Sequence, residues 1–97
     1  MKSLFAVVLT LWASVAFARS PSGTPEYDAE AKALSMMAQD YGGYKPLDAQ
    51  VRSNQLSIAI PAKNARGVRV DFKCYVRRVD LRGGGYRYEV SRPVIGQ

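Results

Sequence analysis

The residue types that could carry chemistry in this chain are few, because it has no histidine and a single cysteine. This composition excludes Ser-His-Asp and Cys-His nucleophile pairs, zinc sites that use histidine, and an internal disulfide. Cys74 lies between Phe72 and Val76 in an alternating apolar pattern, so we predict a buried thiol without a catalytic role. No metal or cofactor is predicted, because the acidic residues are scattered and show no ligand spacing.

Three other patterns have a structural interpretation that is simpler than a functional one. Asp71 and Glu89 alternate with Arg and Lys, as expected for charge pairs between neighbouring strands. The glycine run 83–85 lacks the Lys-Ser/Thr and the following helix of a phosphate-binding loop, so it predicts a hairpin turn. The segment 66–72 lacks most of the aromatic residues that an RNA-binding strand needs. None of these patterns predicts catalysis or RNA binding.

Basic and aromatic side chains in the C-terminal half are the remaining candidates. Residues 45–97 carry eleven basic and four acidic groups, whereas residues 19–44 carry two basic and four acidic ones. This asymmetry predicts a surface that attracts anions, and Arg and Tyr are enriched where proteins bind partners. The predicted binding residues are Arg69, Lys73, Tyr75, Arg77 and Arg87 on one sheet face, with Arg78 and Arg82 near its rim. The alternative is a solvated face whose charges only prevent aggregation.

Residues 1–18 have the pattern of a cleaved signal peptide. Lys2 precedes an almost unbroken apolar run, and Ala16 and Ala18 place small residues where signal peptidase reads them. The run of about 15 residues is shorter than the ~20 needed to span a bilayer. We therefore predict cleavage after Ala18, a periplasmic or secreted protein, and no membrane span after cleavage. Residues 19–23 are expected to form a flexible leader, and residues 24–97 a single small domain.

The first element of this domain is predicted to be an amphipathic helix. Thr24 can cap it, Pro25 suits its first position, and Gly42-Gly43 can end it. The predicted buried stripe comprises Tyr27, Ala31, Leu34, Ala38 and Tyr41, with Met37 at its edge. On the other side, Ala29, Ala33 and Met36 form a small apolar strip that predicts a contact between protomers. The expected state is a monomer or a weak homodimer.

After residue 46 the hydrophobic period changes to two, which indicates strands. Strands are predicted at 47–51, 56–60, 68–76 and 86–90, with Pro61 ending the second of them. The predicted fold class is α+β. It has one N-terminal amphipathic helix packed on a four-stranded antiparallel meander, in the order α-β-β-β-β and in two layers.

The register of the last hairpin can be predicted from its charges. Pairing Val76 with Val90 sets Arg77 opposite Glu89, whereas a slip by two residues would set Arg77 opposite Arg87. We predict the first register, which also brings Arg78 close to Tyr88. Because Arg78 would then be on the inner side, a bulge is expected near the turn.

Two classes of function fit these features. The first is a small non-enzymatic binding module, such as an inhibitor, an immunity-type protein or an envelope accessory protein. Its predicted partner is an acidic protein or an anionic envelope polymer, and nucleic acid is disfavoured because the protein is expected to be exported. The second is a small hydrolase or nuclease that acts on an anionic substrate without histidine. An enzyme should present a concave pocket with a perturbed carboxylate, and a docking module should present a flat charged face.

Overall fold

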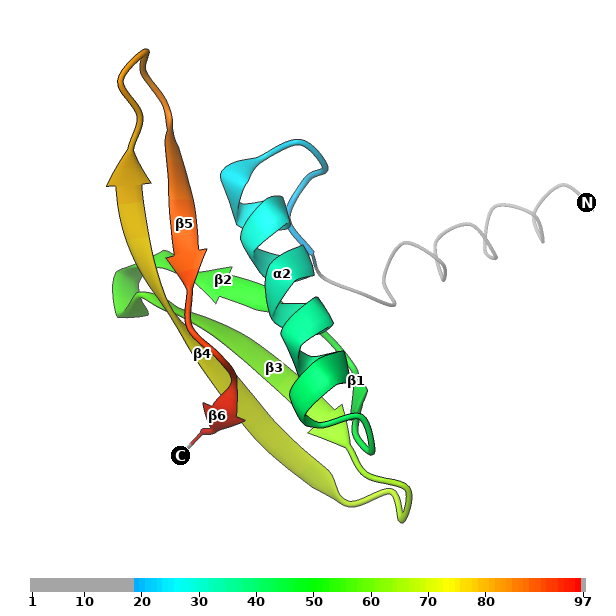
Figure 1. Ribbon diagram of the computed structural model, residues 1–97. Helices are drawn as coiled ribbons and strands as arrows, with labels where there is room; N and C mark the ends of the chain where they lie inside the picture. The colour runs from blue at the N-terminus through cyan, green and yellow to red at the C-terminus, as the bar shows by residue number, and fades with distance from the viewer. Residues whose placement is uncertain (1–18, 97) are drawn as a thin grey trace, which may run out of the picture.

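The structure is a computed structural model that describes residues 19–96. The predicted signal peptide, residues 1–18, lies outside the described residues. The elements are α2 (Pro25–Asp40), β1 (Lys45–Pro46), β2 (Gln50–Arg52), a 3-10 turn (Ser53–Gln55), β3 (Ser57–Lys63), β4 (Arg69–Asp80), β5 (Tyr86–Val90) and β6 (Val94–Ile95). The helix lies across one face of a curled antiparallel sheet, which confirms the predicted α+β class (Figure 1).

The sheet has six strands instead of the four predicted. Its main path is β1-β3-β4-β5, while β2 also pairs with β3 and β6 also pairs with β4. One strand was predicted at 47–51, but two short strands, β1 and β2, pair with β3 before and after residues 47–49. The chain after β5 continues along β4 as β6. The two extra strands are therefore pieces of the edge strands of the predicted meander.

Pro61 lies inside β3, so the prediction that it ends this strand is wrong. It pairs with Asp71 of β4, and its carbonyl oxygen accepts a hydrogen bond from the Leu47 N–H at 2.7 Å. The N–H and C=O of one strand residue point to the same side, so the N–H that proline lacks would have faced away from β4. On that side the edge strand is interrupted between β1 and β2. Pro61 is tolerated there because it removes no hydrogen bond between β3 and β4.

Helix α2 has the predicted ends but buries a different face. The Thr24 side chain accepts a hydrogen bond from the Tyr27 N–H at 3.1 Å, and Pro25 occupies the first turn. The buried residues of the helix are Ala29, Glu30, Ala33, Met36 and Met37. The predicted stripe is wrong: Leu34 and Tyr41 pack at the margin of the core, and Ala31 and Ala38 are exposed.

Ala29, Ala33 and Met36 are consequently not an exposed strip available to a second protomer. They are buried within the chain itself, and Ala29 and Ala33 belong to the core cluster between helix and sheet. The small side chains of Ala29 and Ala33 let the backbone of the helix approach the sheet closely at these two positions. The predicted contact between protomers through this strip is therefore wrong, because the three side chains are already buried within the chain.

Arg19 and Ser20 are anchored instead of forming part of a free leader. Glu30 is completely buried, and its carboxylate accepts hydrogen bonds from the Ser20 N–H at 3.0 Å and from the Ser20 hydroxyl at 2.7 Å. The Arg19 Nε lies 3.7 Å from Glu30 Oε1. The same carboxylate accepts from the Val51 N–H at 3.0 Å. One side chain therefore joins the N-terminal segment, the helix and β2.

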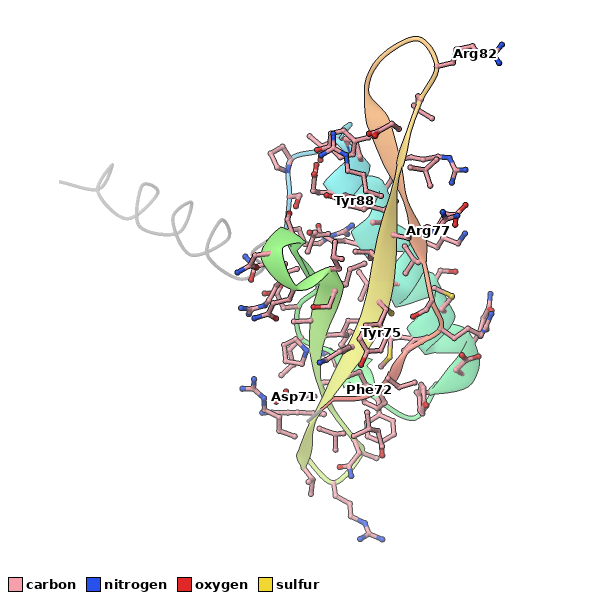
Figure 2. All side chains as sticks on the ribbon, turned by 90° about the vertical axis from the view of Figure 1, so that its left-hand side faces the viewer. Asp71, Phe72, Tyr75, Arg77, Arg82 and Tyr88 are labelled. Carbon is pink, nitrogen blue, oxygen red and sulfur yellow. The ribbon has the colours of Figure 1, made fainter. Side chains whose placement is uncertain are left out.

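The last hairpin has the predicted register. Val76 pairs with Val90, Arg77 with Glu89 and Arg78 with Tyr88. Pairing then continues regularly to the turn, so the predicted bulge is wrong. Arg78 is accommodated without a bulge because it lies over the Tyr86 ring, 4.0 Å from its centroid, and pairs with Asp80. The hairpin extends past the helix and the other strands, with Arg82 at its tip (Figures 1 and 2).

Glu26, near the start of the helix, binds the last hairpin. One oxygen of this carboxylate, Oε2, accepts hydrogen bonds from the Tyr86 hydroxyl at 2.5 Å and the Tyr88 hydroxyl at 3.3 Å. The Tyr86 hydrogen bond is the main reason why the pKa of Glu26 is below its usual value of 4.5. The folded state therefore prefers Glu26 ionised.

We expect the variant Glu26→Gln to lose less stability in acid than the wild type. A carboxylate with a lowered folded pKa stabilises the protein above its unfolded pKa, and this contribution disappears as pH falls through the folded pKa. For Glu26 the loss begins near pH 4.5 and continues below it. Urea unfolding at about pH 7 and about pH 3 measures the difference. Equal losses in the wild type and the variant would contradict this role of Glu26.

Candidate functional site

The sheet face opposite the helix, called the outer face below, collects most of the predicted binding residues. Cross-strand partners share a face and successive residues alternate, so the registers assign its members. Its charged and aromatic residues are Lys45, Arg52, Lys63, Arg69, Asp71, Lys73, Tyr75, Arg77, Arg87 and Glu89. Seven of them are basic and two are acidic. Tyr75 is 55% exposed and lies near the middle of this face (Figure 2).

One row of the outer face consists of three cations. Lys45 pairs directly with Lys63, and Lys63 pairs directly with Arg69. Like charges at directly opposed strand positions destabilise a sheet. Arg69 is partly neutralised by Asp71, whose Oδ1 lies 3.1 Å from its Nε. The stability of the sheet therefore does not explain why three cations occupy directly opposed positions in this row.

The cations at the hairpin end of the face are paired. Arg77 donates to Glu89 Oε1 through Nε at 3.1 Å, and the Arg87 Nη2 lies 3.4 Å from Glu89 Oε2. The Arg77 hydrogen bond lowers the pKa of Glu89 below its usual range. Both ion pairs are solvent-exposed, so each contributes little to stability. This end of the face behaves as an ordinary charge-paired ribbon.

Four other cations of the outer face differ, because none of them is held in an ion pair within residues 19–96. Within residues 19–96, no carboxylate lies within 4.0 Å of Lys45, Arg52, Lys63 or Lys73. Lys73 instead has its Nζ 5.6 Å from the Tyr75 ring centroid. The positive charge that is available to a ligand is therefore concentrated between β2 and β4, not on the hairpin.

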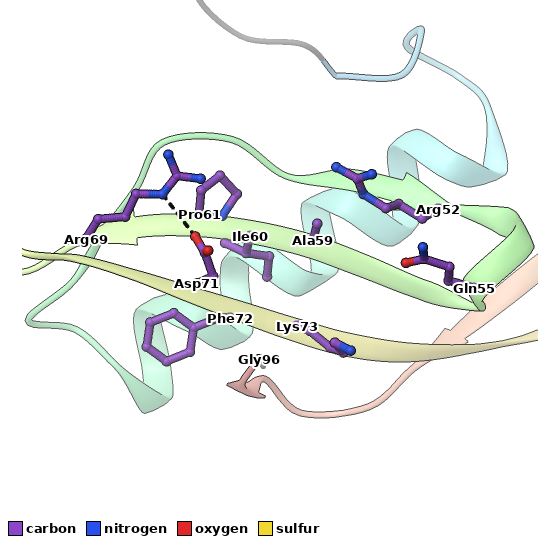
Figure 3. A pocket seen from close by; sticks show the side chains of 10 residues that line it. All are labelled: Arg52, Gln55, Ala59, Ile60, Pro61, Arg69, Asp71, Phe72, Lys73 and Gly96. Carbon is purple, nitrogen blue, oxygen red and sulfur yellow. Dashed lines mark hydrogen bonds and ion pairs between the residues drawn. The ribbon is translucent and has the colours of Figure 1, made fainter.

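A shallow trough of about 300 Å³ lies beside two of these cations, Arg52 and Lys73 (Figure 3). Its base is formed by Ala59 and Pro61, whose short side chains leave space between longer neighbours. Its rim carries Arg52, Gln55, Lys73 and the ion pair of Arg69 with Asp71. A hollow with three cations, an amide and a carboxylate can hold an anionic group and can also accept hydrogen bonds from hydroxyl groups of the same ligand.

Two predicted binding residues lie away from the outer face. Arg78 has the opposite orientation in β4, where it contacts Tyr86 and Asp80, and Arg82 is in the hairpin turn. Sequence reasoning missed Lys45, Arg52 and Lys63, because all three lie outside the strands that it predicted. The signal that could have found Lys63 is the extension of the strand pattern past Pro61, through Ala62 to Lys63.

Other kinds of chemistry have little support in the described part of the chain. No group of three or more His, Cys, Asp or Glu residues that could hold a metal ion occurs in residues 19–96. Cys74 is buried in the core, and burial raises the pKa of its thiol to about 11, so it is a poor nucleophile near neutral pH. No helix in this range is long and apolar enough to cross a membrane.

Comparisons with known proteins add no functional information. No protein-family model, no curated protein and no solved structure matches this chain. The function has to be argued from the geometry of the outer face.

Proposed function

We propose that this chain is a small exported binding module, without enzymatic activity, that docks an acidic partner through its outer face. The observation that carries the proposal is the excess of seven basic over two acidic side chains on this face, including four cations that are not held in an ion pair within residues 19–96. The row of Lys45, Lys63 and Arg69 adds like-charge repulsion that a bound anion would relieve.

An acidic protein or an anionic polymer of the cell envelope can supply the negative charge that this face would bind. The export pattern of residues 1–18 supports a partner outside the cytoplasm. Docking is favoured over hydrolysis because the carboxylate in the trough, Asp71, is exposed and held in an ion pair with Arg69. A general acid or base is more often a carboxylate that burial has desolvated.

Binding to two defined polyanions tests this proposal. We expect the full-length chain, expressed with a C-terminal tag, to bind immobilised polyglutamate, polygalacturonate or both at about 0.05 M salt. Replacing both Arg52 and Lys73 by alanine should weaken the binding about tenfold, since each contact between exposed opposite charges is worth up to about 1 kcal/mol and about 1.4 kcal/mol corresponds to a factor of ten. Biolayer interferometry measures both affinities.

A second double variant serves as the matched control. Lys32→Ala with Arg82→Ala removes the same net charge, but these residues are on the helix and at the hairpin tip, and within residues 19–96 no carboxylate lies within 4.0 Å of either. It should bind like the wild type. Equal weakening of both double variants would mean that only net charge matters, and it would overturn a site on the outer face.

A further inference from the structure

The trough on the outer face has a composition that selects among anionic partners. We infer that it is a subsite for one acidic sugar unit of an anionic polysaccharide, a ring that carries a carboxylate together with free hydroxyl groups. This inference rests on the proposed function and specifies the partner of the same face. It follows from the size of the trough, the mixture of groups on its rim, and its position in the sheet.

The size of the trough suits a single compact unit. Its volume of about 300 Å³ is at the lower limit of the sites that hold small molecules, which span roughly 300 to 1,000 Å³. Ala59 and Pro61 line the trough with apolar atoms, which can cover the C–H face of a ring. The longer side chains of Arg52 and Lys73 stand at the rim (Figure 3).

The rim offers both donors and acceptors. Arg52 and Lys73 can donate to a carboxylate, and Gln55 can both donate and accept. Asp71 accepts only, and one of its two oxygens is in contact with Arg69. A ligand whose only polar groups are anionic would be repelled by Asp71. A ligand that also carries hydroxyl groups can donate to its other oxygen.

The position of the trough disfavours an extended acidic peptide. Peptides that bind sheets usually add a strand at an exposed edge, where main-chain groups are free. The trough lies over the paired residues of β3 and β4, from Ala59 with Lys73 to Pro61 with Asp71. Recognition there depends on side chains, and a flexible peptide would also lose about 1 to 2 kcal/mol of backbone entropy for each ordered residue.

The face continues beyond the trough in ways that suit a polymer. At one side lies the exposed ring of Tyr75, with the Lys73 ammonium against it. At the other lies the row of Lys45, Lys63 and Arg69. Arg69 and Lys73 are four residues apart on one strand, which is about 13 Å. Successive acidic rings of a chain can therefore meet cations on both sides of the trough.

The replacement Asp71→Asn distinguishes an acidic sugar from a simple polyanion. For oligogalacturonate we expect roughly fivefold weaker binding by the variant, because the amide is a weaker acceptor for a sugar hydroxyl. For oligoglutamate of equal charge we expect equal or stronger binding, because one negative charge has been removed. Isothermal titration of the full-length chain with both oligomers measures the two constants. The fully methyl-esterified oligogalacturonate should not bind, since it has lost its charge.

The outcomes separate this inference from the proposed function. Nitrogen-15 chemical-shift changes on Ala59, Lys73 and Gly96 during the oligogalacturonate titration would place the sugar in the trough, as expected. If oligoglutamate binds the outer face while oligogalacturonate does not, the sugar subsite is overturned and the binding module stands. The same conclusion follows if Asp71→Asn strengthens the binding of both oligomers. If neither oligomer binds, the proposed function fails as well.

Discussion

Replacing Glu30 by alanine is expected to lower the free energy of unfolding by about 3 to 5 kcal/mol, the cost of breaking a buried charged interaction by removing one partner. The Glu30 side chain has no solvent exposure, and its two oxygens accept hydrogen bonds from two backbone N–H groups and one hydroxyl. Without the carboxylate, the N–H of Val51 loses its acceptor at a half-buried position. Each such orphaned donor costs roughly 1 to 3 kcal/mol.

Urea or thermal unfolding measures the effect. For a domain of this size, a loss of about 3 kcal/mol corresponds to a decrease in Tm of roughly 12 °C or more. Glu30→Gln keeps the volume and should be less harmful than alanine, but its single oxygen cannot replace both carboxylate oxygens. The control is Asp28→Asn, an exposed carboxylate on the same helix, which should change stability by less than about 1 kcal/mol. Similar stabilities of the wild type and both Glu30 variants would show that this anchor is dispensable.

Replacing Phe72 by alanine should also cost about 3 to 5 kcal/mol, through lost burial and the cavity left behind. Phe72 is 2% exposed, and its ring centroid lies 4.6 Å from that of Tyr41 and 5.1 Å from that of Tyr44. The two tyrosines follow the helix, so this aromatic cluster joins the end of α2 to the centre of β4. Such aromatic pairs contribute about 0.5 to 1.5 kcal/mol beyond their burial.

Tyr75→Ala provides the matched control for Phe72→Ala. Both residues belong to β4 and both lose an aromatic ring, but Tyr75 points to the outer face and is 55% exposed. We expect it to change the free energy of unfolding, measured with urea, only slightly, by about 0.5 kcal/mol or less. Phe72→Leu should fall between the wild type and alanine, because it leaves a smaller cavity. A Tyr75 variant as unstable as the Phe72 variant would contradict the assignment of the two faces.

Some features of this protein follow from local sequence alone. The start of the helix was predictable because Thr24 and Pro25 act on their nearest neighbours. The inner face of β4 was predictable because Phe72, Cys74 and Val76 alternate with charged residues over a long run. The hairpin register was predictable because Arg77 has a favourable partner in only one of two alignments.

Other features depend on partners that are distant in the sequence. The buried helix face includes Glu30, which no hydrophobic pattern would place in the core. It is buried because Ser20 and Val51 supply hydrogen bonds from ten residues before it and twenty-one after it. Pro61 could remain inside β3 only because the opposite edge strand is interrupted there.

The candidate site likewise has features that follow from local sequence and features that depend on the folded sheet. Sequence alternation placed Arg69, Lys73, Tyr75 and Arg77 on one face, since the period of a strand is local. It did not show which of these cations are neutralised or that Arg52 and Lys63 join them, because both depend on pairing between strands. The sequence determined the charge of the face. The tertiary structure decided where that charge is unpaired and where the trough lies, because cross-strand neighbours are set by the folded sheet and not by the order of residues.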